Sequence, residues 1–288
     1  MCAPLAGLFL YIGPVKKKTT AFKWWVKFAH LPLIQPLLSG LAPVAFSRMH
    51  QRIQFHKDEE FSLLPILCDR ERISLDVGVL FGGYAREMMD HSQDVFMIEA
   101  NPLQVAFLRR AFPDQRQRII SSAAGASTGE IEIRVPRSMP GNATVESENH
   151  LDRHKKLRSF TVPIRPLDEL FPGSDIGFIK IDVEGHENAV LSGAQRLIER
   201  CRPKVILECI DDHKKGAVAQ MRSFFQEMEY AVLFLSENAL HDIAEYDASY
   251  IDPSKRNSKA FVNNFVAVPK EELDSFQARF SADQLNRR

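Results

Sequence analysis

From residue 58 onward, short apolar runs alternate with stretches of helical periodicity, and this alternation constrains the fold more than any other feature. Runs typical of buried strands lie at 73–78, 94–100, 116–124, 176–182, 203–210, 230–236 and 261–269. Stretches with helical spacing follow several of them, at 83–91, 102–112, 187–200 and 216–229. Such an alternation predicts an α/β fold with a doubly wound, mostly parallel, seven-stranded sheet and helices on both of its faces.

Three regions lie outside this alternation. Residues 129–135 and 160–166 are extended runs with no helical pattern between them, which predicts an antiparallel insertion. The polar segment 136–159 joins them, and its composition fits either a lid over a site or an insert without substrate contact. The polar residues of this segment include Arg137, Asn142, His150, Arg153 and His154.

The ends of the chain predict an extension and a tail around one domain. Residues 1–57 are interrupted by prolines and predict a helical or irregular extension, the domain spans 58–270, and 271–288 form a C-terminal tail. Residues 58–71 open on acidic residues and predict a helix that Pro65 limits. The aromatic and basic segment 21–31 fits peripheral contact with a membrane surface. The alternative is a helix packed on the domain or on a sister subunit of a homo-oligomer.

Charge and cysteine content exclude several classes of partner. The 37 basic and 37 acidic residues balance to a formal net charge of zero, which gives no reason to expect nucleic acid held by bulk charge. An uncharged acceptor, such as a sugar hydroxyl, stays open. The four cysteines show no zinc-like spacing, and we expect reduced thiols in a cytoplasmic protein.

Polar residues crowd the end of the apolar run 176–182. Asp182, Glu184, His186 and Glu187 fall within six positions, where ligands of open parallel sheets bind. We expect Asp182 to organise the ligands, with His186 or Glu184 as proton acceptor, whereas Glu187 caps the next helix. A metal-assisted alternative pairs Asp182 with Glu208, which could hold Mg²⁺.

A glycine-containing turn follows the first predicted strand. Asp76, Gly78 and Gly82 stand where the backbone must turn sharply beside a ligand. Glu99 ends the second strand, at the spacing of an acid that binds ribose hydroxyls. A dinucleotide site favours a fuller glycine pattern and no acid at position 76. An acid there favours a cationic cofactor such as S-adenosylmethionine.

The order of these motifs resembles the FkbM-type S-adenosylmethionine-dependent methyltransferases. The resemblance covers roughly residues 60–269, and IKIDVEGHE is its most specific element. It implies the class I methyltransferase (Rossmann-like) fold, with Asp76, Gly78 and Gly82 in the donor loop. Residue by residue it also assigns Glu99 to the ribose, and Ser122 and Ala123 to the adenine edge; we expect Asn101, which ends the strand beside Glu99, to be a further cofactor-binding residue.

The resemblance further implies O-methylation of a saccharide or glycosylated natural product. One departure is that Val79, Leu80 and Phe81 stand where the family loop commonly has Ala-Asn-Ile. Leu80 keeps open the alternative of a catalytically inactive binding or scaffolding module, and a nicotinamide oxidoreductase is the third reading.

Overall fold

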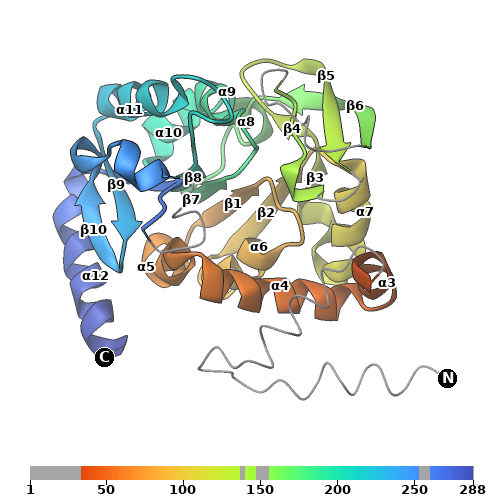
Figure 1. Ribbon diagram of the computed structural model, residues 1–288, viewed down its shortest axis with the longest axis horizontal. Helices are drawn as coiled ribbons and strands as arrows, with labels where there is room; N and C mark the ends of the chain where they lie inside the picture. The colour runs from red at the N-terminus through yellow and green to blue at the C-terminus, as the bar shows by residue number, and fades with distance from the viewer. Residues whose placement is uncertain (1–33, 137–139, 147–155, 253–259, 288) are drawn as a thin grey trace.

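The computed structural model describes residues 34–136, 140–146, 156–252 and 260–287. An eight-stranded sheet forms its centre, in the order β10-β9-β11-β8-β7-β1-β2-β3 (Figure 1). Its strands are β1 (Ile73–Val77), β2 (Asp94–Glu99), β3 (Ile119–Ser121), β7 (Ile176–Ile181), β8 (Lys204–Glu208), β9 (Tyr230–Ser236), β10 (Ala239–Asp242) and β11 (Asn264–Pro269).

Strand directions confirm the predicted doubly wound, mostly parallel sheet. β1 pairs in parallel with β2 and β7, and the parallel pairing continues to β3 on one side and β8 on the other. β11 is antiparallel to both β8 and β9, between which it lies. The carboxyl ends of β1, β2 and β7 therefore meet at one edge, where ligands of such sheets bind.

The main sheet has eight strands, one more than the seven predicted. The additional strand, β10, forms an antiparallel hairpin with β9. The two residues between these strands, Glu237 and Asn238, both have positive φ, of 53° and 66°. Two central residues with positive φ are typical of the tight turn that matches the twist of a hairpin.

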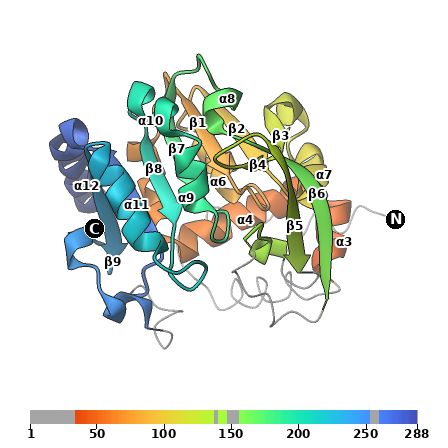
Figure 2. The same ribbon diagram turned by 90° about the horizontal axis from the view of Figure 1, so that it is seen from above.

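Helices cover both faces of the sheet and bury two apolar layers (Figure 2). One face packs against α8 (Leu167–Leu170), α9 (Glu187–Ser192), α10 (Gln195–Cys201) and α11 (Ala217–Glu227). The other face packs against α4 (Pro43–Lys57), α5 (Leu64–Leu67), α6 (Gly83–Met88), α7 (Pro102–Ala111) and α12 (Leu273–Arg287). This two-sided burial explains why the strands read as near-continuous apolar runs.

The described part of the N-terminal extension is helical and joins the second of these layers. α3 (Ile34–Leu41) leads into α4, which runs beneath α6 and α7 (Figure 1). Phe46 of α4 is fully buried and packs edge-on against Phe81 and Phe107, with ring centroids 5.0 and 6.0 Å apart. The segment 21–31 lies outside the described residues. Within the part that is described, no helix combines the length and apolarity needed to span a bilayer.

Four predicted elements differ in detail from the structure. The helix expected over 58–71 is a 3-10 turn, Glu59–Leu63, followed by the short α5, because Pro65 lies in its first turn. The helix expected over 187–200 breaks at Gly193 into α9 and α10. The strand expected over 116–124 keeps only Ile119–Ser121 in the main sheet. The expected tail 271–288 contains α12, whose Phe276 and Phe280 are buried.

The predicted antiparallel insertion is confirmed as a small second sheet, β4-β6-β5. β5 (Gly129–Pro136) pairs along its whole length with β6 (Leu157–Arg165), and β4 (Ala123–Ala124) adds in parallel to β6. After β3 the chain therefore leaves the main sheet at Ser122 and enters the small one. This crossing brings the small sheet to the carboxyl edge beside β2 and β3.

Candidate functional site

The ends of β1, β2 and β7 are tied together by backbone hydrogen bonds. The amide of Gly78 donates to Ile98 O at 3.0 Å, and the amide of Asp182 donates to Val77 O at 2.9 Å. Gly78 has φ +83°, and a Cβ added there would lie 1.7 Å from the carbonyl oxygen of Asp182. Only glycine permits both the left-handed conformation and this approach of the two strand ends.

A cavity opens between this edge and the small sheet. Its walls come from the ends of β1, β2 and β7, from the crossing 122–124 and from the segment 140–146. Among the predicted site residues the cavity brings together Gly78, Glu99, Ser122, Ala123, Asp182, Glu184 and His186. Three of these are carboxylates, and the part of its wall formed by the described residues contains no lysine or arginine.

Glu99 is buried in the cavity wall and fixes the donor loop. Its Oε2 accepts from the amides of Val79 and Leu80, each at 3.1 Å, and its Oε1 accepts from the amide of Asn101 at 2.8 Å. Burial raises the pKa of Glu99, and these three amides oppose the rise. A carboxylate oxygen has two acceptor sites, so Oε1 retains one for a hydroxyl donor.

Asp76 takes a different position from the one predicted. Its side chain is fully buried and is not among the residues that line the cavity. The Lys180 ammonium lies 3.8 Å from Asp76 Oδ1 and 3.1 Å from Asp182 Oδ2. Burial raises the pKa of Asp76 to about 6, although Lys180 lowers it. Lys180 thus lies between Asp76 and Asp182, and it also donates to Gly78 O at 3.1 Å.

The donor loop holds its shape without the asparagine common in related loops. Leu80 adopts φ +52°, a conformation that costs roughly 1–2 kcal/mol for a side chain other than glycine or asparagine. Its amide is held by Glu99, and its side chain lines the cavity. Gly82 also has positive φ, 73°, and its backbone packs closely on the ring of Phe112 where α6 begins.

Two of the three predicted cofactor-binding residues that follow Glu99 line the cavity, and one does not. Ser122 and Ala123 line the wall as expected, whereas Asn101 does not. The Asn101 side chain instead caps α7, because its Oδ1 accepts from the amide of Leu103 at 3.0 Å.

Gln104 is a site residue that the sequence did not reveal. It lines the cavity, is 5% exposed, and its Nε2 has no hydrogen-bond partner among the described residues. The sequence did not reveal it because Gln104 stands three positions after the N-cap Asn101, where a glutamine is expected to form part of a capping box. A buried amide without a partner costs free energy, and a ligand that accepts from it would remove that cost.

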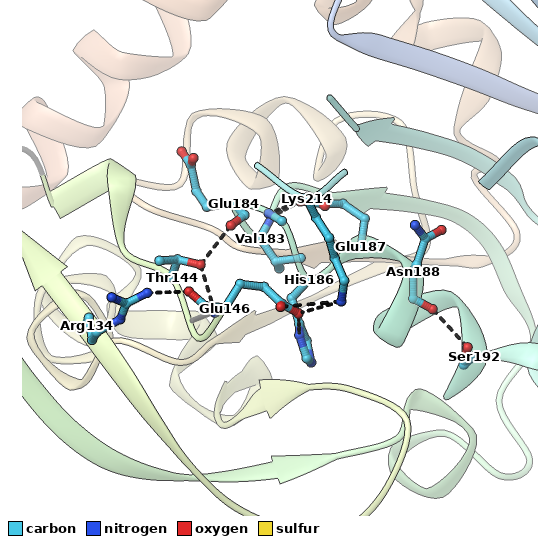
Figure 3. A network of polar contacts seen from close by, with 11 residues as sticks. Arg134, Thr144, Glu146, Val183, Glu184, His186, Glu187, Asn188, Ser192 and Lys214 are labelled. Carbon is cyan, nitrogen blue, oxygen red and sulfur yellow. Dashed lines mark hydrogen bonds and ion pairs between the residues drawn. The ribbon is translucent and has the colours of Figure 1, made fainter. Parts of the chain in front are cut away.

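His186 is the N-cap residue of α9, and it lines the cavity. Its Nδ1 is 2.6 Å from Oε1 of Glu146, a residue of the segment 140–146 (Figure 3). Its Nε2 is buried and has no hydrogen-bond partner in the part of the chain that the structure describes. An imidazole held at one nitrogen and unpartnered at the other can accept a proton from a bound ligand.

The two other acids after β7, Glu184 and Glu187, make different contacts. Burial and the charges of Asp182 and Glu208 raise the pKa of Glu184, whose Oε2 lies 3.4 Å from His213 Nε2. Glu187 supports the turn as expected of a structural acid, because its Oε1 accepts from the amides of Val183 and Gly185.

The metal alternative receives no support from the geometry. Glu208 Oε1 accepts from the Asn263 amide at 2.7 Å, and Asp182 Oδ2 is already bound to Lys180. Among the described residues, no group of three or more histidine, cysteine or acidic side chains could hold a metal ion.

The described part of the predicted lid lies against the cavity. Gly141, Ala143 and Val145 line it, whereas Asn142 does not. Four further polar residues assigned to this lid lie outside the described residues, namely Arg137, His150, Arg153 and His154.

The residues present fit S-adenosylmethionine better than an anionic cofactor. The described wall contains carboxylates and neither lysine nor arginine. Such a wall suits a ligand with an ammonium and a sulfonium group, and it would repel a pyrophosphate. Glu99 retains an acceptor site for a ribose hydroxyl, and the unpartnered Gln104 Nε2 can donate to a polar atom of a nucleoside. Gly78 and Asp182 provide the backbone edge on which the rest of the donor would lie.

Comparisons with known proteins agree with this fit. The family model of the methyltransferase FkbM domain matches residues 76–232, whereas no curated protein matches the chain. Methyltransferase FkbM from Methylobacillus flagellatus KT is 16% identical, with a TM-score of 0.45, and the alignment covers 82% of this chain and 59% of that one. The O-methyltransferase from Bacillus cereus, solved in complex with SAH, is 13% identical, with a TM-score of 0.36 and coverage of 89% and 94%.

The aligned part of this chain spans less than two thirds of the Methylobacillus protein. At such low identities and TM-scores, the two solved structures indicate nothing about the substrate of this chain. The family match is the decisive comparison, because it covers more than half of the chain and includes the donor loop, Glu99 and the turn after β7. The order of the main sheet, with the antiparallel β11 inserted between β8 and β9, is that of the predicted class I methyltransferase fold with β10 added. The protein therefore belongs to the FkbM methyltransferase family.

Proposed function

We propose that this protein transfers a methyl group to a hydroxyl of a saccharide or of a glycosylated natural product. The observation that carries the proposal is His186, which lines the cavity and whose buried Nε2 has no hydrogen-bond partner among the described residues. A hydroxyl oxygen must lose its proton as it becomes an ether. A buried proton acceptor at the cavity wall supplies that need.

Glu99, Asp182 and His186 have different roles in this reaction. S-adenosylmethionine, when bound, would supply an electrophilic methyl group, whose bond to sulfur breaks as the bond to the acceptor oxygen forms, with S-adenosylhomocysteine as the leaving group. Glu99 binds the ribose hydroxyls and holds the donor loop, and Asp182 orients the ligands from the end of β7. His186 Nε2 takes the proton of the acceptor hydroxyl and later passes it to solvent. Closely packed walls exclude water, and alignment of the reacting atoms does the remaining work.

The zero net charge of the chain and the absence of lysine and arginine from the described part of the wall support an uncharged acceptor over an anionic one. The test is incubation of the full chain with methyl-tritiated donor and fractionated glycans, nucleotide sugars and glycosylated metabolites. Label that resists mild alkali excludes a methyl ester, and a product whose added methyl group is located on a hydroxyl oxygen by mass spectrometry supports the proposal. Label released by mild alkali identifies a methyl ester and contradicts it.

A binding or scaffolding module without turnover is the second candidate. The side chain of Leu80 favours it, because an apolar group lines the cavity where related loops carry an amide. Against it stand the three amides that Glu99 binds, which preserve the loop despite Leu80. Donor binding at normal affinity with no transfer to any fraction would favour the module.

A further inference from the structure

Glu146 lies outside every motif of the sequence, yet it makes the closest polar contact of His186. The carboxylate and the imidazole come from positions 40 residues apart, and their side chains are 13% and 12% exposed. The Lys214 ammonium lies 3.3 and 3.4 Å from the two Glu146 oxygens and restricts how the carboxylate can turn (Figure 3). Glu146 is therefore held from both sides.

The segment that carries Glu146 is anchored to the edge of the small sheet and to the turn after β7. Thr144 exchanges backbone hydrogen bonds with Arg134 at 2.9 and 3.1 Å, and the Arg134 guanidinium donates to Glu146 O. The Thr144 hydroxyl donates to Glu184 O at 2.8 Å and accepts from the Glu146 amide at 3.0 Å. These contacts place Glu146 beside His186 only when the segment is seated on the turn.

The contact determines which imidazole nitrogen carries hydrogen. An ionised carboxylate can only accept hydrogen bonds, so the neutral imidazole facing it must carry its hydrogen on Nδ1. The lone pair then lies on Nε2, the nitrogen that is buried in the cavity wall and has no partner among the described residues. In the opposite tautomer Nε2 would be a donor and could not accept a proton.

We propose that Glu146 is a positioning residue for methyl transfer, which holds His186 in the Nδ1–H tautomer and so keeps the lone pair on Nε2. The proposal rests on the proposed function, in which His186 takes the acceptor's proton. That proton moves from the acceptor hydroxyl to Nε2, and Glu146 faces the imidazolium that results. Gly141, Ala143 and Val145 of the same segment line the cavity, so seating of the segment closes the wall and orients the proton acceptor together.

The decisive variant is Glu146→Gln, which keeps size but can donate as well as accept. We expect kcat to fall by at least about tenfold, since general-base catalysis contributes roughly 10²–10⁴-fold. The Kd for S-adenosylmethionine should stay within about threefold. Glu146→Asp keeps the charge but is one methylene shorter, and we expect it to lose rate in the same way. Glu132→Gln, at an exposed position of β5, is the matched control and should leave kcat unchanged.

Two readouts separate positioning from a structural role. The ¹⁵N spectrum of His186 should show the Nδ1–H tautomer in the native protein and a mixture in Glu146→Gln. In a His186→Ala background, Glu146→Gln should cause no further loss of kcat. An equal loss in both backgrounds, an unchanged tautomer or an unchanged kcat would overturn the proposal. Failure of the native protein to methylate any hydroxyl would refute the proposed function instead, and the tautomer measurement would still decide the role of Glu146.

Discussion

The Cα of Gly78 lies so close to the backbone of Asp182 that an added Cβ would be 1.7 Å from the Asp182 carbonyl oxygen. This approach brings the donor loop after β1 against the end of β7, which carries the acids and His186. The two ends form one wall of the cavity. The geometry of the site therefore depends on a residue without a side chain.

Gly78→Ala should damage both stability and donor binding. The clash is with backbone, which cannot rotate away, and φ +83° adds strain for any side chain. We expect the free energy of unfolding to fall by at least about 2 kcal/mol in urea titrations. Gly173→Ala is the matched control, because nothing lies within 4 Å of its added Cβ. Equal stability of the two variants would contradict the close approach.

Gln104→Leu should change stability and affinity in opposite directions. Leucine removes a buried amide nitrogen that has no partner among the described residues, so the melting temperature of the free protein should hold or rise. The lost hydrogen bond to the donor should cost about 0.5–1.5 kcal/mol of binding, or roughly 2- to 13-fold in Kd. Calorimetry and thermal melts measure both quantities. Gln220→Leu, exposed on α11, is the control, and unchanged affinity in Gln104→Leu would refute a donor contact.

His186→Ala should slow turnover and leave donor binding intact. Loss of a general base lowers kcat by roughly 10²–10⁴-fold, whereas the hydrogen bond that the structure gives the ring is to Glu146 and not to Glu99 or the donor loop. Initial rates across pH 6–9, with donor Kd measured separately, provide the test. If the rate is unchanged over that range, another group accepts the proton.

Glu60 should make stability fall as pH rises. Burial raises its pKa from 4.5 to about 8. Between these values the folded chain holds a proton that the unfolded chain has released, so its contribution is full below about pH 4.5 and lost through about pH 8. At about 1.4 kcal/mol per pKa unit, we expect a loss of at least about 2 kcal/mol between pH 5 and 8.

Urea unfolding at pH 5 and pH 8 measures this dependence, and Glu60→Gln should flatten it. Part of the dependence should remain in the variant, because burial also raises the pKa of Glu187 to about 7 and of Asp76 to about 6. The same pH dependence in the native protein and in Glu60→Gln would show that Glu60 is not the source.

Most of the main sheet could be predicted from the sequence, because strands buried on both faces read as apolar runs. The same burial hides side-chain direction. Leu75 and Val77 face one helical layer and Asp76 the other, but with both faces buried the pattern does not show which face borders the ligand. Asp76 was therefore assigned to the cavity that its neighbour Gly78 lines. β10 was missed because its four residues are exposed or half-buried and carry no apolar run.

The candidate site could be predicted where its residues follow a strand, and not where they come from elsewhere. Glu99, Asp182 and His186 were found because strand ends of parallel sheets converge. Gln104 resembles an ordinary helix cap, and Glu146 reaches His186 from 40 residues away. Such contacts depend on the tertiary fold and leave no local periodicity.

The central claim is that the cavity between Glu99 and Asp182 binds S-adenosylmethionine. Calorimetric titration of the full chain and of Glu99→Ala with this donor tests it most directly. The variant loses the acceptor for the ribose hydroxyls and the anchor of Val79, Leu80 and Asn101. We predict saturable binding to the native protein, weakened in Glu99→Ala by roughly 1–3 kcal/mol. No binding to the native protein, or equal affinity in the variant, would contradict the claim.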